Sequence, residues 1–422
     1  MKLRATAPAL ATLAALTAAS LGAQEGTGLQ PSSAKTTPVE VVEETKSSTV
    51  ADWEDGSLSV DSPVGEFSLG GYATFIHKTI DRYNGGGSEN FFDAIRIVPQ
   101  FEWQIVDWLD FNMELELEGG GADVSFLSGN EILIEFAETN ATLIDEFNIQ
   151  AGILLIPFGR YNLNHDDLNW DLADRPYVAR RVTPTAFGQP GFGIYGTFNQ
   201  LEALSISYEL DVTQGFDDEF SSNGGARPAR QSFRADNNGN KAIWARLGLT
   251  PSFATAGIEA LAADFGLSFT YQEIGPDNSQ SLRGVSVDGA VSITASERVG
   301  IGITGEWSRL WINRDSAIDR PNGLWGFFVD LELKIDPFPA EWRGTHLGRN
   351  PYIGLIVRFE QNDLNDDHVG AAARDDRIGT TVGLAFRPLS KLVVRIEFKH
   401  QQSQGTDAGD ETRLVTGVTV GF

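Results

Sequence analysis

Apolar residues alternate with polar or small residues along most of the chain after residue 66. In the run Phe111–Glu118, Phe, Met and two Leu occupy every second position, and Asn and three Glu occupy the positions between them. Successive side chains of a strand point to opposite faces, so this period of two separates the charges from the apolar groups. A helical period would mix them. The pattern predicts strands with one apolar and one polar face.

About sixteen such segments, each near ten residues long, follow one another along the chain. We place them at residues 67–80, 91–105, 110–118, 130–138, 146–157, 191–199, 203–213, 240–250, 263–274, 283–295, 298–312, 322–335, 350–361, 375–387, 390–401 and 410–422. Short turns alternate with longer loops, although the connections at 251–262 and 336–349 are long for turns. This arrangement is typical of an outer-membrane β-barrel.

A large soluble β-sandwich is the alternative fold, and in it the apolar faces would pack together inside. The polar faces of the predicted strands carry charges of both signs, which suits a water-filled interior, and a closed barrel leaves no strand edge unpaired in lipid. We therefore predict an all-β fold, a transmembrane antiparallel barrel over residues 67–422. Ionised side chains face its lumen, and apolar side chains, aromatic ones included, face lipid.

The amino terminus has the order of a secretory signal peptide. Lys2 and Arg4 precede an apolar, alanine-rich stretch that ends in small residues, so we expect residues 1–23 to be removed after Ala23. Residues 24–66 are rich in Ser, Thr, Pro and Glu without a clear period, and we expect a flexible periplasmic segment. No apolar window of about 18 residues follows, so membrane insertion must use strands.

The last predicted strand alternates up to the terminal Phe422. It resembles the carboxyl-terminal signature of bacterial outer-membrane barrels, which the barrel-insertion machinery reads. With the signal peptide, this resemblance implies the outer membrane of a Gram-negative-type bacterium, with outer-membrane lipid and the insertion machinery as partners.

Composition and charge exclude several classes of function. The 422 residues include no Cys, 32 Lys and Arg, and 58 Asp and Glu, for a net charge of −26. A cysteine nucleophile and a cysteine metal site are excluded, and a nucleic-acid partner would need a basic face. The five His lie in no recognisable catalytic motif, so we predict no enzyme, no cofactor and no metal site. The acidic segments 217–219 and 362–368 offer oxygen ligands for calcium without the spacing of a known calcium loop.

The passage Gln150–Arg160 resembles the G-x-x-x-x-P-F-G entry to the third loop of the phosphate-selective porin O and P family. The pair Arg180-Arg181 and the later segment Gly191–Gly196 are similar to that family's return from the loop. The resemblance implies a trimeric, sixteen-stranded passive channel. It also implies that the long third loop, residues 158–190, folds into the lumen and narrows the pore.

The third loop carries charges of both signs. We predict that it forms the pore constriction with Arg160, His165, Asp166, Asp167, Asp171, Asp174, Arg175, Arg180 and Arg181. Opposed charges across a constriction orient polar solutes and so contribute selectivity. In the other interpretation, Arg175, Arg180 and Arg181 pair with the loop's Asp residues and hold its shape; the two interpretations are compatible.

The predicted lumen face is rich in acids. Its predicted members are Glu102, Glu114, Glu116, Glu118, Glu131, Glu135, Asp330, Glu332 and Glu360, together with Arg96, Arg358, Arg395 and Arg413. The best-known members of the resembling family select anions with a ladder of Arg and Lys. The charge of this chain instead favours a general or weakly cation-preferring porin for small hydrophilic or ionic solutes. An anion- or phosphate-selective porin, and a non-conducting barrel that serves as a structural anchor or surface-binding protein, remain the alternatives.

Overall fold

The computed structural model describes residues 49–422, except for 53–56, 84–86, 119–130, 232, 234–235, 237–238, 240, 255–256, 276–277, 315–319, 367–375 and 404–408. The side chains of residues 49–52, 57, 93–95, 118 and 131 are also outside the description. The predicted signal peptide, and the part of the predicted periplasmic segment before residue 49, lie outside the described residues.

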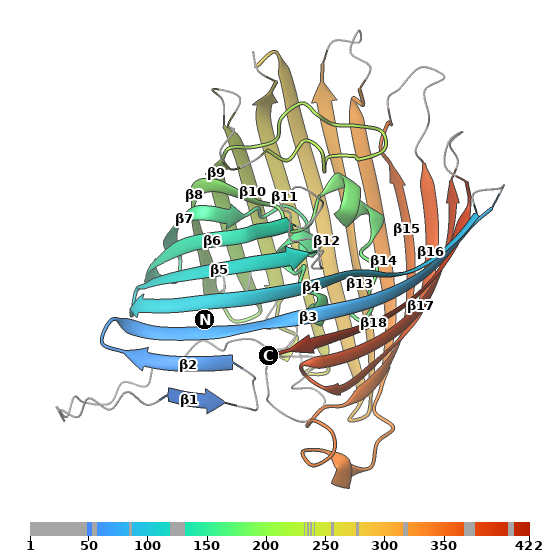
Figure 1. The fold of residues 1–422 in the computed structure, drawn as a ribbon. Coiled ribbons are helices and arrows are strands. Elements are labelled where there is room, and N and C mark those ends of the chain that lie inside the picture. Colours follow the sequence, from blue (N-terminus) through green and yellow to red (C-terminus); the bar gives the residue numbers. More distant parts are fainter. Residues whose placement is uncertain are drawn as a thin grey trace.

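Sixteen antiparallel strands form a closed barrel (Figure 1). Each strand pairs with the next, and the last, β18, pairs with β3 to close the ring. The strands are β3 (Gly65–Arg82), β4 (Gly87–Val106), β5 (Leu109–Glu118), β6 (Glu131–Ile144), β7 (Phe147–Leu155), β8 (Gly188–Leu201), β9 (Leu204–Thr213), β10 (Ala242–Pro251), β11 (Leu261–Ile274), β12 (Gln280–Ser296), β13 (Val299–Asn313), β14 (Gly323–Ile335), β15 (Tyr352–Asp363), β16 (Arg377–Leu389), β17 (Leu392–Ser403) and β18 (Glu411–Gly421).

The sixteen predicted strands are all present, with ends that differ by a few residues. The two connections that are long for turns follow β10 and β14 and do not hide a further barrel strand. The second of them contains the short helix η4 (Ala340–Trp342). Among the described residues, no helix is long and apolar enough to cross a bilayer.

The alternation separates the outside of the barrel from the inside. On β11, Phe265, Leu267 and Phe269 are 45–49% exposed, whereas Ser268 and Thr270, which alternate with them, are fully buried. The same arrangement recurs on the other strands, so a belt of apolar side chains surrounds a polar interior. A soluble sandwich would bury these apolar rows. Their exposure on a closed barrel is the arrangement that a lipid bilayer requires.

The prediction that aromatic side chains face lipid is incomplete. Trp244 on β10 and Phe328 on β14 point inward and are buried. The ring centroids of Trp244 and Phe158 are 5.7 Å apart, and Phe187 stacks on Phe216 at 4.7 Å. The long connections after β7 and β9 carry their own apolar residues into the barrel, and the inward aromatic side chains bury against them. This apolar cluster also includes Tyr161, Trp170, Val178, Phe220, Leu310 and Leu324.

Two strands precede the barrel, within the segment that was predicted to lack regular structure: β1 (Thr49–Asp52) and β2 (Ser57–Ser62). β2 pairs with the start of β3, so that Leu58 lies opposite Leu69. Phe422 follows β18 and exchanges two backbone hydrogen bonds with Gly71, of 3.1 and 2.9 Å. β2 and β18 therefore lie one after the other along the same edge of β3, and both run antiparallel to it. β2 is too short to reveal a period in the sequence.

Candidate functional site

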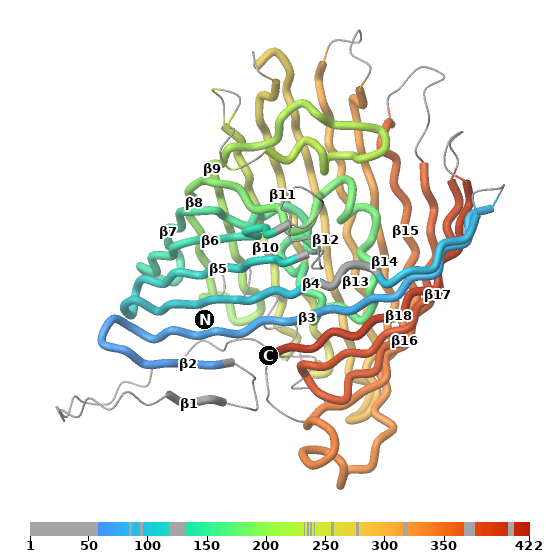
Figure 2. Tube along the Cα trace, in the orientation of Figure 1, coloured from blue at the N-terminus to red at the C-terminus, as the bar shows by residue number. Residues whose placement is uncertain are grey.

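The connection between β7 and β8, residues 156–187, crosses the interior of the barrel; we call it the third loop. It contains three short helices, α2 (Arg160–Leu163), η1 (Asp167–Asn169) and η2 (Val178–Val182). In Figure 2 it is the green segment that lies within the ring of strands. Its hydrogen bonds reach inward-facing side chains on both sides of that ring, from β4 to β17.

The entry to the third loop is fitted to one wall. Gly159 has a φ of 78°, which favours glycine, and a side chain there would begin 2.5 Å from the carboxylate of Glu306 on β13. The close approach lets the backbone N–H of Tyr161 donate to Glu306 at 2.9 Å. Phe158, just before the glycine, packs on Trp244. The P-F-G passage thus turns the chain inward and docks it.

Three glutamates of the barrel wall hold the backbone of the third loop. Glu306 accepts from Tyr161, as above, and Glu360 on β15 accepts from the backbone N–H of Tyr177 at 2.6 Å. Glu397 on β17 accepts from two successive backbone N–H groups, those of residues 173 and 174, both at 2.9 Å. The sequence identified Glu360 as a lumen residue but missed Glu306 and Glu397, although both occupy inward positions in the alternation.

The predicted constriction arginines divide into two groups. Arg175 lies 3.8 Å from Asp167 and Arg180 lies 3.1 Å from Asp174, as expected if they hold the shape of the loop. Arg160 instead pairs with two wall carboxylates, Asp264 on β11 and, at 3.3 Å, Asp288 on β12. Arg181 donates to the backbone carbonyl of Asn223 at 2.7 Å.

Asp171 and Asp174 connect the third loop to basic residues on β16, β17 and β18. Asp171 lies 2.5 Å from Arg387 on β16, and Asp174 lies 3.3 Å from Lys399 on β17 and 3.5 Å from Arg413 on β18. Burial alone would raise the pKa of both carboxyls. Arg387 and Lys399 outweigh burial and hold both pKa values well below the usual range. Both carboxylates are therefore ionised at neutral pH.

Asp167 and its neighbours connect the loop to β4 and β17. The carboxylate of Asp167 lies 3.3 Å from Arg96 on β4. Burial would raise the pKa of Asp167, but Arg96, followed by Arg175, lowers it below the usual value. Arg395 on β17 donates to the backbone carbonyls of Asp167 and Trp170, the latter at 2.7 Å. Guanidinium groups from two parts of the wall thus converge on one turn of the loop.

Other predicted lumen residues pair along the wall itself. Arg358 forms two hydrogen bonds of 2.7 Å with Asp330, Arg96 pairs with Glu116, and Lys334 lies 3.2 Å from Glu332. The described lumen predictions that are buried are Glu114, Glu116, Glu135, Asp330, Arg358, Glu360 and Arg395. Glu102, Glu332 and Arg413 are partly buried, and the side chains of Glu118 and Glu131 lie outside the described residues.

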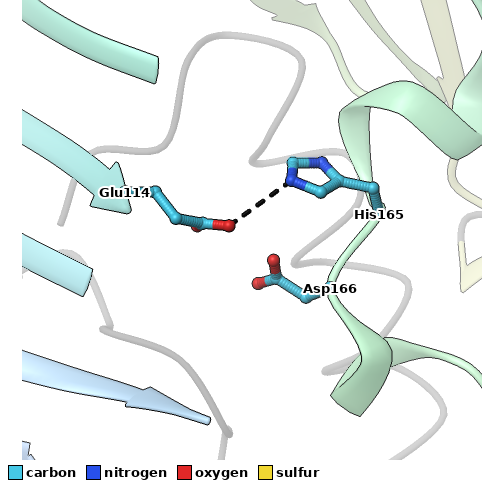
Figure 3. A group of neighbouring side chains, drawn as sticks. All are labelled: Glu114, His165 and Asp166. Carbon is cyan, nitrogen blue, oxygen red and sulfur yellow. Dashed lines mark ion pairs between the residues drawn. The ribbon is translucent and has the colours of Figure 1, made fainter. Parts of the chain in front are cut away.

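The buried His165 faces two wall carboxylates. Its Nε2 lies 3.0 Å from Glu135 on β6 and 3.4 Å from Glu114 on β5, and Asp166 lies beside them (Figure 3). Its Nδ1 lies 2.8 Å from the carbonyl of Asn162. Burial would lower the pKa of His165, but Glu135 and Glu114 outweigh burial and raise it well above its ordinary value. We call Glu114, Glu135, His165 and Asp166 the His165 cluster. From the sequence, Glu114 and Glu135 are predicted as lumen residues and His165 and Asp166 as constriction residues, but nothing indicates that the four lie close together.

The acidic segments noted as calcium candidates have protein partners. Asp218 and Glu219 lie 3.1 and 2.9 Å from Arg320. Asp366 pairs with Arg309, and the rest of that segment, residues 367 and 368, lies outside the described residues. Asp218, Glu219 and Asp366 are therefore each paired with an arginine.

No family model matches the chain. A curated relative, an uncharacterized protein of Aquifex aeolicus (strain VF5), is 30% identical over 186 residues. That match covers 43% of this chain and 39% of the relative, so the chain matches well under half of the relative's length.

Solved structures share the fold over most of both chains. They include OmpF of Salmonella typhi in complex with daunomycin (TM-score 0.51, 12% identity, 85% of this chain and 98% of that one). An anion-selective porin from Comamonas acidovorans has a TM-score of 0.50 at 11% identity, over 84% of this chain and 99% of that one. OmpTdeltaL8 of Vibrio cholerae, a loop deletion mutant of an outer membrane protein, has a TM-score of 0.50 at 10% identity, over 85% and 100%.

The fold defines the class of protein. A closed sixteen-stranded antiparallel barrel with an apolar belt and a polar interior is the fold of an outer-membrane β-barrel, and solved porins share this fold. The barrel and its belt place the chain in the outer membrane of a Gram-negative-type bacterium.

Proposed function

We propose that the chain is a porin, a passive channel for small hydrophilic or ionic solutes. The observation that carries the proposal is the charged third loop inside a closed barrel, bonded to wall residues from β4 to β17. Such a loop narrows the lumen and lines the narrow part with ionised groups, which is how a pore sorts solutes by size and charge. The predicted constriction residues, Arg160 to Arg181, take this role in the proposal.

We infer a weak preference for cations. Basic groups of the interior have acidic partners: Arg358 has Asp330, Arg387 has Asp171, and Arg160 has Asp264. The His165 cluster, in contrast, gathers three carboxylates around one imidazole. With a net charge of −26 for the chain, the field in the lumen attracts cations.

Insertion through the terminal strand that ends in Phe422 rests on the resemblance to the carboxyl-terminal signature of outer-membrane barrels. The absence of catalysis rests on the lack of a recognisable catalytic motif. Assembly as a homotrimer rests on the resemblance to the phosphate-selective porin O and P family. The same resemblance supports an anion-selective channel as the second candidate. The pairing of the interior arginines with acids argues for the cation preference over it.

Conductance in a planar lipid bilayer tests the proposal. We expect the purified barrel to open in conductance steps. A folded barrel that shows no conductance would instead indicate a structural anchor or surface-binding protein. The reversal potential under a KCl gradient then decides the preference. A sign that indicates chloride selectivity would overturn the cation preference and favour the anion-selective candidate.

A further inference from the structure

The contacts of His165 leave one ring nitrogen, Nε2, facing the wall carboxylates. A carbonyl oxygen only accepts, so the 2.8 Å contact with Asn162 requires that Nδ1 carries a hydrogen and donates it. Nε2 then faces Glu135 at 3.0 Å and Glu114 at 3.4 Å. A positive centre, either a proton or a metal ion on Nε2, must lie between this nitrogen and the carboxylates. Metal-ligating histidines have this arrangement, with the second nitrogen held by a carbonyl.

Two carboxylate oxygens of the cluster accept no hydrogen bond from the residues that the structure describes. They are Oε1 of Glu114, which has the 3.4 Å contact with Nε2 of His165, and Oε1 of Glu135. The two side chains are only 2% and 1% exposed. An ionised oxygen that is buried without a donor is costly unless a cation compensates it. Both oxygens therefore point to a cation at this place.

The donor atoms lie close enough for one ion to join them. The ligand atoms of Glu114, His165 and Asp166 all lie within 4.8 Å of one another (Figure 3). The side-chain amide of Gln100 donates to Glu114 at 2.8 Å and to Asp166 at 3.0 Å, and so orients these two carboxylates toward the same point. Fixed outer partners of this kind are what a preformed metal site requires.

We propose that Glu114, His165 and Asp166 bind a divalent transition-metal ion, with the carboxylate of Glu135 beside them. An imidazole together with carboxylates suits zinc and its first-row neighbours, whereas calcium and magnesium take oxygen ligands alone. Three carboxylates also exceed the charge that a single proton on His165 can balance. The sequence hides the site because its ligands lie on β5 and the third loop, which are about fifty residues apart.

The ion clamps the third loop to the wall of the barrel. Glu114 and Glu135 belong to β5 and β6, whereas His165 and Asp166 belong to the loop between α2 and η1. Release of the ion loosens this part of the loop, whose other contacts with the wall include Gln100 with Asp166, Arg96 with Asp167, and Arg395 with the carbonyl of Asp167.

Calorimetric titration with Zn²⁺ tests the site. The full chain, folded in detergent micelles without an affinity tag, is stripped with a chelator and titrated with ZnCl₂. We expect one Zn²⁺ per chain, and H165N and D166N should each weaken binding by at least about tenfold. Asp166 is partly exposed, so D166N is expected to fold, as the electrophoretic shift on heating will check. The matched control H346N removes an exposed histidine and should leave binding unchanged.

X-ray absorption at the zinc edge supplies an independent readout, with one imidazole and otherwise oxygen ligands expected. Wild-type protein that shows no saturable binding, or binding that survives both H165N and D166N, would overturn the site. Calorimetry does not depend on conduction, so the metal site and the porin function fail separately. If the barrel binds zinc but does not conduct, the metal site stands and the porin function fails. If it conducts but does not bind zinc, the porin function stands and the metal site fails.

Discussion

The third loop meets two chemically different walls of one barrel. Against β10–β14 it is packed through the apolar cluster, in which Phe158 and Phe187 contact Trp244. Against β15–β18 it is held mainly by ion pairs such as Asp171 with Arg387, beside a small apolar patch around Leu172. Apolar contacts are insensitive to pH, whereas a buried ion pair is lost when one of its partners titrates. The contacts of the loop are therefore independent of pH on one side and dependent on it on the other.

The largest expected effect is on the apolar side. Phe158→Ala removes a buried ring from the cluster and should lower the free energy of unfolding by about 3–5 kcal/mol. Urea unfolding of the barrel in micelles measures it. The control Phe233→Ala truncates an exposed ring in the connection after β9 and should change stability by less than about 0.5 kcal/mol. Equal effects of the two would contradict apolar anchoring.

On the ionic side, Arg387→Met leaves Asp171 with the hydroxyl of Tyr352, 2.9 Å away, as its remaining donor. We expect a loss of about 1–3 kcal/mol, because a buried charge loses its main partner. Arg320→Met, which breaks a partly exposed pair with Asp218, should cost less than about 1 kcal/mol. The same unfolding assay compares them, and a larger cost for Arg320→Met would show that the ionic wall contributes little.

Acid should weaken the ionic wall only well below neutrality. Because the pKa of Asp171 is lower in the folded chain than the usual value of about 3.9, its contribution is present above about 3.9 and is lost as the pH falls through the lower folded value. The stability difference between wild type and D171N should therefore stay constant from pH 7 to about 5 and narrow below about 4. Narrowing between pH 7 and 5 would show that Asp171 is not held ionised.

The smallest expected effect on stability comes from Arg180, whose side chain is 34% exposed and pairs with Asp174. Arg180→Ala should cost at most about 1 kcal/mol. It should nevertheless raise the cation-to-anion permeability ratio about twofold at low salt, since it removes a positive charge from the third loop. The shift should vanish in 1 M KCl, where the screening length is about 3 Å. Arg298→Ala, at the exposed turn after β12, is the control, and an equal shift there would exclude a local role for Arg180.

The sequence predicted the barrel well because strand position is a local property. Alternation alone located β14, on whose opposite faces Phe327 and Phe328 lie, the first partly exposed and the second buried. It did not show what the inward side chains meet. Arg160 and Asp264 are 104 residues apart in sequence, and their pairing follows from the path of the loop through the lumen, which no local pattern records.

The same limit explains the two features that were missed. Trp244 belongs to the apolar cluster only because the connections after β7 and β9 carry apolar residues inside. The His165 cluster exists only because α2 and η1 present His165 and Asp166 to β5 and β6. Both depend on contacts between segments that the fold brings together. The sequence therefore identified candidate residues but not their arrangement in a site.

The arrangement of β18 and β2 makes the barrel amenable to circular permutation. Phe422 lies opposite Gly71, and Leu58 lies opposite Leu69, on one edge of β3 and in one direction, so a peptide link of one or two residues would fuse them into an unbroken strand. New chain ends can then be introduced in an outer loop. A fluorophore or display peptide attached there would lie on the cell surface, and the barrel strands would stay paired.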